Sequence, residues 1–309
     1  MSKRAIVTGG AGFIGSHVAD ALLADGYEVR VIDDLSSGSA ERVPSGAELI
    51  ELDIVNEPAL LEAFDSFPPQ AVYHLAAQAS VVVSVEDPGR DSEVNVRGTL
   101  NVLQAAGAHG APVVFTSTGG ALYGDEAPRP TPEDRIPAPL SPYGASKWAA
   151  EAYVRTWART SGTQHTVARL GNVYGPRQSP HGEAGVVAIF TGRINERRAP
   201  TLYGHGRPTR DYIYVADVVS ALLAATGRAG VYNIATGVET DVITIWRSLC
   251  EIAGVEIEPE LADLRPGELQ HSCMDISRAR DELGWSPQVA FQEGLELTYR
   301  ALSEEYAPS

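Results

Sequence analysis

Near its N-terminus the chain reads Thr8-Gly9-Gly10-Ala11-Gly12-Phe13-Ile14-Gly15, directly after apolar residues 5–7 and at the start of a helical pattern over 13–24. Its glycines match Gly-x-x-Gly-x-x-Gly, which lets the backbone approach a pyrophosphate at a helix N-terminus. The next predicted strand, 29–32, ends at Asp33, whose carboxylate can accept from an adenosine ribose and would repel a 2′-phosphate. The stretch therefore predicts a dinucleotide site that favours NAD over NADP.

Strand and helix patterns alternate over the first 170 residues. Alternation of this kind predicts a Rossmann-type α/β fold, a doubly wound parallel sheet that binds ligands at its strand ends. We expect strands at 5–8, 29–32, 49–52, 71–75, 113–116 and 165–169, and helices at 13–24, 58–64, 94–106 and 143–160.

After Asn172 the alternation breaks into a stretch rich in Gly, Pro and Arg, then returns with a strand and helix over 211–225 and a strand over 231–234. This predicts a smaller, discontinuous C-terminal α/β domain. We assign residues 1–170 plus 211–236 to the NAD-binding domain and 171–210 plus 237–309 to a nucleotide-sugar-binding domain. The Pro-rich segment 127–142 is expected to be an ordered loop that leads into the helix of Tyr143, with a surface excursion as the alternative.

Composition narrows the function further. The formal net charge of −16 argues against nucleic-acid binding, which needs a basic surface, although residues 177–210 are locally rich in arginine. No long apolar run or signal-peptide pattern is present, so we expect a cytoplasmic protein that does not bind membranes. Cys250 and Cys273 lack metal-ligand spacing, and neither a metal site nor a disulfide is expected.

A second motif, Tyr143-x-x-x-Lys147, follows Ser141-Pro142. A helix that begins there places Tyr143 and Lys147 on one face, where a cation near the phenol favours the phenolate, a usable base. The same pair is common on solvated helix faces, and the glycine loop is what favours the catalytic interpretation.

Two further turns follow predicted strands. Asp53-Ile54 is placed to flank the adenine, and Leu75-Ala76-Ala77 the pyrophosphate and nicotinamide half. Helix capping by Asp53 and close strand packing of the alanines are the alternatives.

Taken together, these residues resemble the extended short-chain dehydrogenases/reductases that act on nucleotide-sugars, most closely the NAD-dependent UDP-glucose (UDP-galactose) 4-epimerases. The resemblance covers nearly the whole chain. Beyond the two motifs above it rests on residues 74–77, 95–99, 116–118 with 122–124, 172–177, 210–215 and 265–268.

The resemblance implies a mechanism in which one carbon is oxidised and reduced again. Tyr143 would be the base, Lys147 would orient the nicotinamide ribose and lower the phenol pKa, and Thr118, with Ser117 beside it, would hydrogen-bond the sugar 4-hydroxyl. The 4-keto sugar would turn over and take the hydride back on its opposite face.

The resemblance also implies binding residues. Those for NAD are Gly9, Gly12, Phe13, Ile14, Gly15, Asp33, Asp34, Leu35, Ser37, Gly38, Asp53, Ile54, Leu75, Ala76, Ala77, Asn95, Thr116, Tyr143 and Lys147. Those for the UDP-sugar are Thr118, Tyr143, Asn172, Arg177, Gly185, Val186, Val187, Thr201, Tyr203, Arg210, Arg265, Glu268 and Ser272. Arg210 and Arg265 would clamp the diphosphate, since guanidinium groups bind phosphate in a bidentate manner.

Several alternatives stay open. Dehydratases and decarboxylases of this kind carry acid residues after the active-strand Thr or Ser, where this chain has Gly119-Gly120, so a 4-epimerase is favoured. Arg177 would suit a C6 carboxylate, which keeps UDP-glucuronate 4-epimerase as an alternative, with a domain-linking salt bridge as its other role. A non-catalytic nucleotide-binding protein of the same fold is less favoured.

Two expectations concern assembly and substrate size. The resemblance implies a homodimer formed through helices 94–106 and 143–160. At the position matched to Ser272, 4-epimerases restricted to unsubstituted hexoses tend to have tyrosine, so the serine predicts room for N-acetylated sugars.

Overall fold

The computed structural model describes residues 3–180, 185–264 and 269–305. Its centre is a seven-stranded sheet with the order β10-β6-β5-β4-β1-β2-β3, and every pairing in it is parallel. The strands are β1 (Lys3–Thr8), β2 (Tyr27–Asp33), β3 (Ala47–Glu51), β4 (Ala71–His74), β5 (Val113–Thr118), β6 (Thr166–Leu170) and β10 (Gly230–Ile234). The predicted doubly wound parallel sheet is confirmed.

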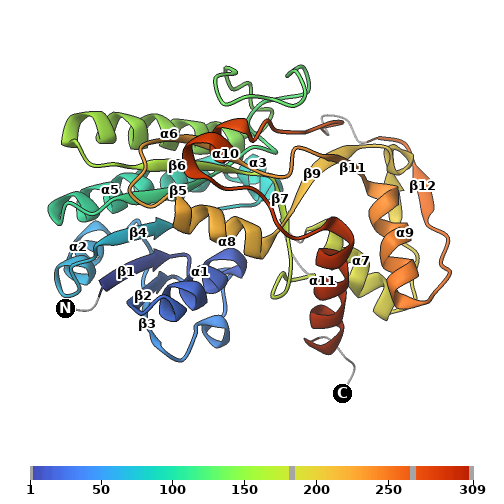
Figure 1. Cartoon of the computed structure of the whole chain (residues 1–309), viewed down its shortest axis with the longest axis horizontal. Coiled ribbons are helices and arrows are strands. Elements are labelled where there is room, and N and C mark those ends of the chain that lie inside the picture. The colour runs from blue at the N-terminus through green and yellow to red at the C-terminus, as the bar shows by residue number, and fades with distance from the viewer. Residues whose placement is uncertain (1–2, 181–184, 265–268, 306–309) are drawn as a thin grey trace.

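Helices cover both faces of this sheet, as Figure 1 shows. Successive strand residues serve opposite faces: Ala5 and Val7 pack in one buried cluster and Ile6 in the other. One face is covered by α1 (Phe13–Ala24) and α8 (Val215–Ala224), and the other by α2 (Glu57–Asp65), α5 (Thr99–Ala108) and α6 (Pro142–Ser161).

A smaller part lies beyond one end of the sheet and packs around a third core that includes Trp246 and Phe190. Its strands form a three-stranded sheet of β7 (Asn172–Tyr174), β9 (Thr209–Tyr214) and β11 (Glu239–Asp241), and a pair of β8 (Thr201–Tyr203) and β12 (Glu260–Ala262). Its helices are α7 (Val186–Asn195), α9 (Val242–Ala253) and α11 (Phe291–Glu305). The strand that we predicted at the start of 211–236 is β9. It pairs with β7 and β11 of the smaller part and not with the strands of the large sheet. The division into two domains stays a prediction.

The predicted helix over 94–106 is two segments. A π-helical turn, η2 (Glu93–Gly98), precedes α5, and the Asn95 carbonyl accepts a 2.6 Å hydrogen bond from the Thr99 hydroxyl. Pi-helical turns are frequent at functional sites. The other short elements are η1 (Ala40–Arg42), α3 (Val81–Glu86), α4 (Pro88–Ser92), η3 (Gly204–Gly206) and α10 (Ser277–Leu283).

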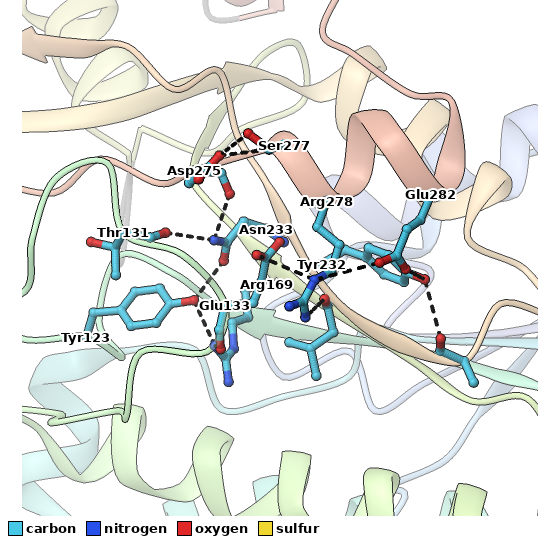
Figure 2. A network of polar contacts seen from close by, with 12 residues as sticks. Tyr123, Thr131, Glu133, Arg169, Tyr232, Asn233, Asp275, Ser277, Arg278 and Glu282 are labelled. Carbon is cyan, nitrogen blue, oxygen red and sulfur yellow. Dashed lines mark hydrogen bonds and ion pairs between the residues drawn. The ribbon is translucent and has the colours of Figure 1, made fainter.

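The Pro-rich segment 127–142 is an ordered loop, as predicted. Asn233 on β10 holds it: its backbone N–H donates to Glu133 Oε1 (2.8 Å) and its side-chain amide to the Thr131 carbonyl (2.9 Å). Figure 2 shows these bonds, with the Tyr123 hydroxyl donating to Asn233 Oδ1. The loop is therefore anchored to β10 of the large sheet on the way to α6.

Within the described residues no helix is both long and apolar enough to cross a membrane. Over the same residues, no three His, Cys, Asp or Glu side chains are grouped in a way that could hold a metal ion.

Candidate active site

The predicted cofactor residues meet at the carboxyl ends of the large sheet. Gly9 follows β1, Asp33 ends β2, Leu75 follows β4 and Thr118 ends β5. Since these strands are parallel, their carboxyl ends share one edge, which is where doubly wound sheets bind ligands.

The glycine loop has the context that a dinucleotide requires. Gly9 has a φ of 72°, and a Cβ there would lie 2.5 Å from the backbone nitrogen of Ala76. A Cβ on Gly15 would collide with the Gly9 carbonyl oxygen. Gly12 is the N-cap of α1 and offers no capping side chain, so the first-turn N–H groups can face an anion.

The Asp33 carboxylate accepts hydrogen bonds from the backbone of the glycine loop and of the segment that follows β2. Its Oδ2 accepts from the Ala11 N–H and its Oδ1 from the Leu35 N–H, both at 2.9 Å. Burial raises the pKa of Asp33, and the two backbone donors oppose that rise. The segment after it returns to the loop, since a Cβ on Gly38 would lie 3.0 Å from Ala11.

Asp53-Ile54 is held by two residues that the sequence did not single out. Arg90 donates to Asp53 Oδ2 at 2.7 Å, and Asn101 donates to the Ile54 carbonyl at 2.9 Å. Burial alone raises the pKa of Asp53, but hydrogen bonds from Arg90 and the Val55 N–H outweigh it and lower that pKa. The sequence feature that could have pointed to Asn101 is its place as a polar residue three positions after Gly98.

Tyr143 and Lys147 occupy the first turns of α6, as predicted. The helix begins after Ser141, whose hydroxyl accepts from the Gly144 N–H at 3.2 Å, with Pro142 in the first turn. Lys147 is buried, and its Nζ lies 4.5 Å from the centre of the Phe115 ring on β5.

The expected low pKa of the phenol is not found. Burial raises the pKa of Tyr143 to about 12; the Thr118 hydroxyl lowers it in part, and the Asp91 carboxylate raises it further. Burial disfavours the phenolate more strongly than the protein's own groups stabilise it. Thr118 is the strand residue that interacts with Tyr143. Ser117 precedes it and therefore points to the opposite face of β5, where its hydroxyl is buried without a partner among the described residues.

Lys147 has a lowered pKa. Burial lowers the pKa of Lys147 to about 8, while the carboxylates of Glu151 and Asp91 act in the opposite direction. Glu151 lies one turn further along α6 and forms a buried ion pair with Arg169 on β6 at 2.7 Å. The face of α6 that carries Tyr143 and Lys147 thus continues into a buried charge pair.

Asn95, in the π-helical turn, is the centre of a second polar group. Its amide nitrogen donates to the Gln78 carbonyl (3.0 Å), Asp91 Oδ1 (3.1 Å) and Ser146 Oγ (3.0 Å), and its Oδ1 accepts from the Gln78 N–H (2.9 Å). The resemblance pointed to Asn95, but Asp91 and Gln78 were missed. Asp91 lies four residues before Asn95, a helical spacing that could have linked them.

A buried histidine connects β1, β4 and α5. Thr99 donates to the Asn95 carbonyl, so it accepts from His74 Nε2 (3.0 Å), and His74 Nδ1 accepts from the Thr8 hydroxyl (2.7 Å). Burial, and then the nearby Lys147 charge, lower the pKa of His74 to about 3. His74 is therefore neutral and adds no charge beside Lys147.

On the substrate side, Arg210 is anchored to main-chain oxygens. It donates to the carbonyls of Thr209 (2.8 Å) and Leu269 (2.6 Å). Gly185 caps α7, which begins with Val186 and Val187, and Thr201 and Tyr203 lie on β8. Arg265 and Glu268 lie outside the described residues. Arg177 forms a 2.7 Å salt bridge with Asp20 on α1, a contact that is compatible with the domain-linking alternative.

Residues 269–276, which we call the strap, join this region to the active strand. The Gln270 N–H donates to Asp125 Oδ1 (2.8 Å), and the Ser272 N–H to the Thr209 carbonyl (3.2 Å). Met274 reaches the end of β5, where a Cβ on Gly119 would collide with its sulfur. The strap therefore passes the end of β5 at Met274, two residues after Ser272.

Comparisons with known proteins agree with this geometry. Residues 5–235 match the model of the NAD dependent epimerase/dehydratase family. The chain is 45% identical over 304 residues to a UDP-glucose 4-epimerase of Mycolicibacterium smegmatis, covering 96% of this chain and 97% of that protein.

Two crystal structures are similar over almost their whole length. A Thermotoga maritima UDP-glucose 4-epimerase with UDP-glucose has a TM-score of 0.95 and 45% identity, with 98% of this chain and 99% of that chain covered. A Thermus thermophilus UDP-glucose 4-epimerase with NAD has a TM-score of 0.90 and 45% identity, with 99% and 100% covered. By its sequence, fold and site, this chain belongs to the NAD dependent epimerase/dehydratase family.

Proposed function

We propose that the chain is an NAD-dependent 4-epimerase of UDP-hexoses that works through a transient 4-keto sugar. The observation that carries this is that half-buried Tyr143 and buried Lys147 share one face of α6, with Tyr143 beside Thr118 at the end of β5 and glycines directly after Thr118. NAD supplies a hydride acceptor and donor when it is bound at the glycine loop.

The protein's share of the reaction is proton transfer and positioning. Tyr143 takes the proton of the sugar 4-hydroxyl and later returns it, while Thr118 holds that hydroxyl. A phenol with a pKa of about 12 holds its proton at neutral pH, so its action as a base in the enzyme with NAD and substrate bound requires stabilisation of the phenolate beyond what the unloaded site provides. Lys147 is the cation that this face of α6 provides.

The space after Thr118 supports epimerisation over elimination. A side chain at Gly119 would displace Met274, and a Cβ at Gly120 would lie 3.2 Å from Asn172 Oδ1. An acid residue at either position would need the side chain of Met274 or Asn172 to shift. Elimination needs such an acid and base, so we propose that 4-keto-6-deoxy sugars are not formed.

For substrate recognition we propose that Arg210 and Asn172 bind the diphosphate or sugar, with Gly185, Val186, Val187, Thr201 and Tyr203 around the uridine. As the resemblance implies, Arg265 would clamp the diphosphate and Glu268 would bind the uridine ribose. UDP-glucuronate as substrate is less favoured, because the Arg177 guanidinium is paired with Asp20.

We also propose a cytoplasmic homodimer. Trp148 and Tyr153, both on α6, expose 39% and 44% of their surface, and a partner's helix would cover exposed aromatic side chains of this kind. Both cysteines are buried and unpaired, as in a reducing compartment. Light scattering on the purified protein would measure the oligomeric state.

The deciding experiment is incubation with UDP-galactose, UDP-N-acetylgalactosamine and UDP-glucuronate, followed by product chromatography and mass spectrometry. We expect UDP-galactose and UDP-glucose to interconvert without net consumption of NAD. Accumulation of a 4-keto-6-deoxy sugar from UDP-glucose at a comparable rate would assign the chain to the dehydratases, and absence of all turnover would favour a binding protein.

A further inference from the structure

We propose that Asp91 is the counter-charge of the catalytic pair: its buried carboxylate, fixed by Asn95 and Gln78, keeps the Lys147 amine cationic beside Tyr143. Asp91 is 1% exposed and lies on α4, outside every motif that the sequence singled out. The inference deepens the proposed function, and only its activity measurement rests on that function.

The two oxygens of the Asp91 carboxylate differ in their hydrogen bonding. Its Oδ1 accepts from Gln78 Nε2 (2.8 Å) and Asn95 Nδ2 (3.1 Å). Its Oδ2 is buried without a hydrogen-bond partner among the described residues. A buried anionic oxygen left without a donor is costly, which is typical of groups kept for a function.

The carboxylate is also tied mechanically to the catalytic helix. The same Asn95 amide that binds Asp91 donates to Ser146 Oγ at 3.0 Å, and Ser146 directly precedes Lys147. The Ser146 hydroxyl donates in turn to the Tyr143 carbonyl at 3.0 Å. Asp91 is thus fixed relative to the turn that carries both catalytic residues.

The other charges near Lys147 are already neutralised. Glu151 receives hydrogen bonds of 3.0, 3.2 and 2.7 Å from Arg169, so its charge is shared with a guanidinium. His74 is neutral, and Phe115 offers only its ring. Over residues 3–180, 185–264 and 269–305, no cationic nitrogen lies within 4.0 Å of Asp91.

Asp91 therefore acts on Lys147 across a gap rather than in a contact ion pair. Water screens buried charges poorly, so their influence extends beyond contact distance. The Asp91 carboxylate acts to raise the pKa of both groups, against the lowering effect of burial in the case of Lys147. It therefore favours the protonated amine of Lys147 and disfavours the phenolate of Tyr143. Asp91 is a positioning residue in this sense: it sets the pH range in which the pair is correctly charged.

The chain is suited to a direct test, because Lys3 and Lys147 are its lysines. Enrichment of lysine with ¹³C at Cε gives one signal for each, and Lys3→Arg assigns them. The pH titration of the Lys147 signal, in the enzyme with NAD bound, is compared in the wild type, Asp91→Asn and Asp87→Asn. Asp87 is the exposed N-cap of the same short helix and serves as the matched control.

We expect Asp91→Asn to lower the Lys147 titration midpoint by about one pH unit, a tenfold change in the neutral fraction, as for loss of a nearby opposite charge. Lys3 should not move, and Asp87→Asn should leave the Lys147 midpoint in place. An unchanged midpoint in Asp91→Asn, or an equal shift in Asp87→Asn, would overturn the proposal. If Asp91→Asn does not fold, Asp91→Ser is titrated instead, with the same two outcomes.

The activity measurement separates charge from structure. In Asp91→Asn, both limbs of the pH profile of kcat/KM for UDP-galactose should move to lower pH. A purely structural role would lower the rate without moving the limbs. If no epimerisation occurs even in the wild type, the proposed function fails while the lysine titration still decides the role of Asp91.

Discussion

At the residue scale, the first prediction concerns the Tyr143 phenol, which we propose to be the proton-transfer group. We predict that Tyr143→Phe leaves the fold and NAD binding intact and lowers kcat by about a hundredfold or more, because proton transfer is lost. Tyr153→Phe on the exposed side of α6 is the control. An epimerisation rate close to that of the wild type in Tyr143→Phe would remove this residue from the mechanism.

Asp33 gives a second prediction at this scale. Its carboxylate should favour the free ribose hydroxyls of NAD over the 2′-phosphate of NADP, and Asp33→Ala should narrow the difference. Equilibrium titration of both cofactors measures it. Some loss of affinity for both is expected as well, because Asp33 also holds the Ala11 N–H of the glycine loop. Tighter binding of NADP by the unmodified protein would refute the assignment.

Ser272 gives the third prediction at the residue scale. Ser272 is a small, half-buried residue of the strap, two residues before Met274 at the end of β5, so we expect a substituent at C2 of the sugar to be tolerated. Ser272→Tyr should lower the rate with UDP-N-acetylgalactosamine by tenfold or more and spare UDP-galactose, because forcing a large group into a packed pocket costs about 1–3 kcal/mol. An equal fall for both substrates would show that Ser272 does not control sugar size.

At the element scale, α6 carries Tyr143, Lys147 and Glu151 on successive turns. Its third turn is held to β6 by the buried ion pair between Glu151 and Arg169. Breaking a buried ion pair by removing one partner leaves the other charge unpaired, so Glu151→Gln should cost about 3–5 kcal/mol of unfolding free energy. The control is Glu28→Gln, which removes the exposed pair with Arg4 and should cost no more than about 1 kcal/mol. Urea unfolding measures both, and similar losses would mean that the buried pair has no special weight.

The elements also show what the sequence could predict. The strands of the large sheet and helix α1 follow from apolar runs and the glycine loop, since local patterns are strong where a strand is buried on both faces. The π-helical turn at 93–98 could not be predicted, because the Asn95 contacts with Gln78 and Ser146 join segments that are 17 and 51 residues apart in the sequence. The pKa of Tyr143 was predicted in the wrong direction for a similar reason: helical spacing gives the position of Lys147 but not the burial of the phenol.

At the scale of the whole molecule, neutral buried histidines make stability depend on pH. The pKa of His74 is about 3 in the folded state and near 6.5 when unfolded, so below pH 6.5 the unfolded chain binds the extra proton. Stability should therefore fall as the pH drops from 6.5 toward 3, by up to about 1.4 kcal/mol per pH unit from this group. Burial lowers the pKa of His165 too, which acts in the same direction.

Urea unfolding at several pH values between 7 and 5 would measure this loss. His74→Gln should make this dependence of stability on pH shallower than it is in the wild type. The prediction fails if the His74 variant and the wild type lose stability in parallel.

The position of β10 has a consequence for how the protein is made. The strand beside β6 is supplied by residues 230–234, after the chain has already built β7, α7, β8 and β9. As the polypeptide leaves the ribosome, the hydrogen-bonding groups along the outer side of β6 must wait for this late strand, and an unpaired strand edge invites association between chains. A truncated chain that stops at residue 176 should accordingly self-associate in gel filtration, and nascent chains stalled at that length should be the ones that chaperones hold most firmly.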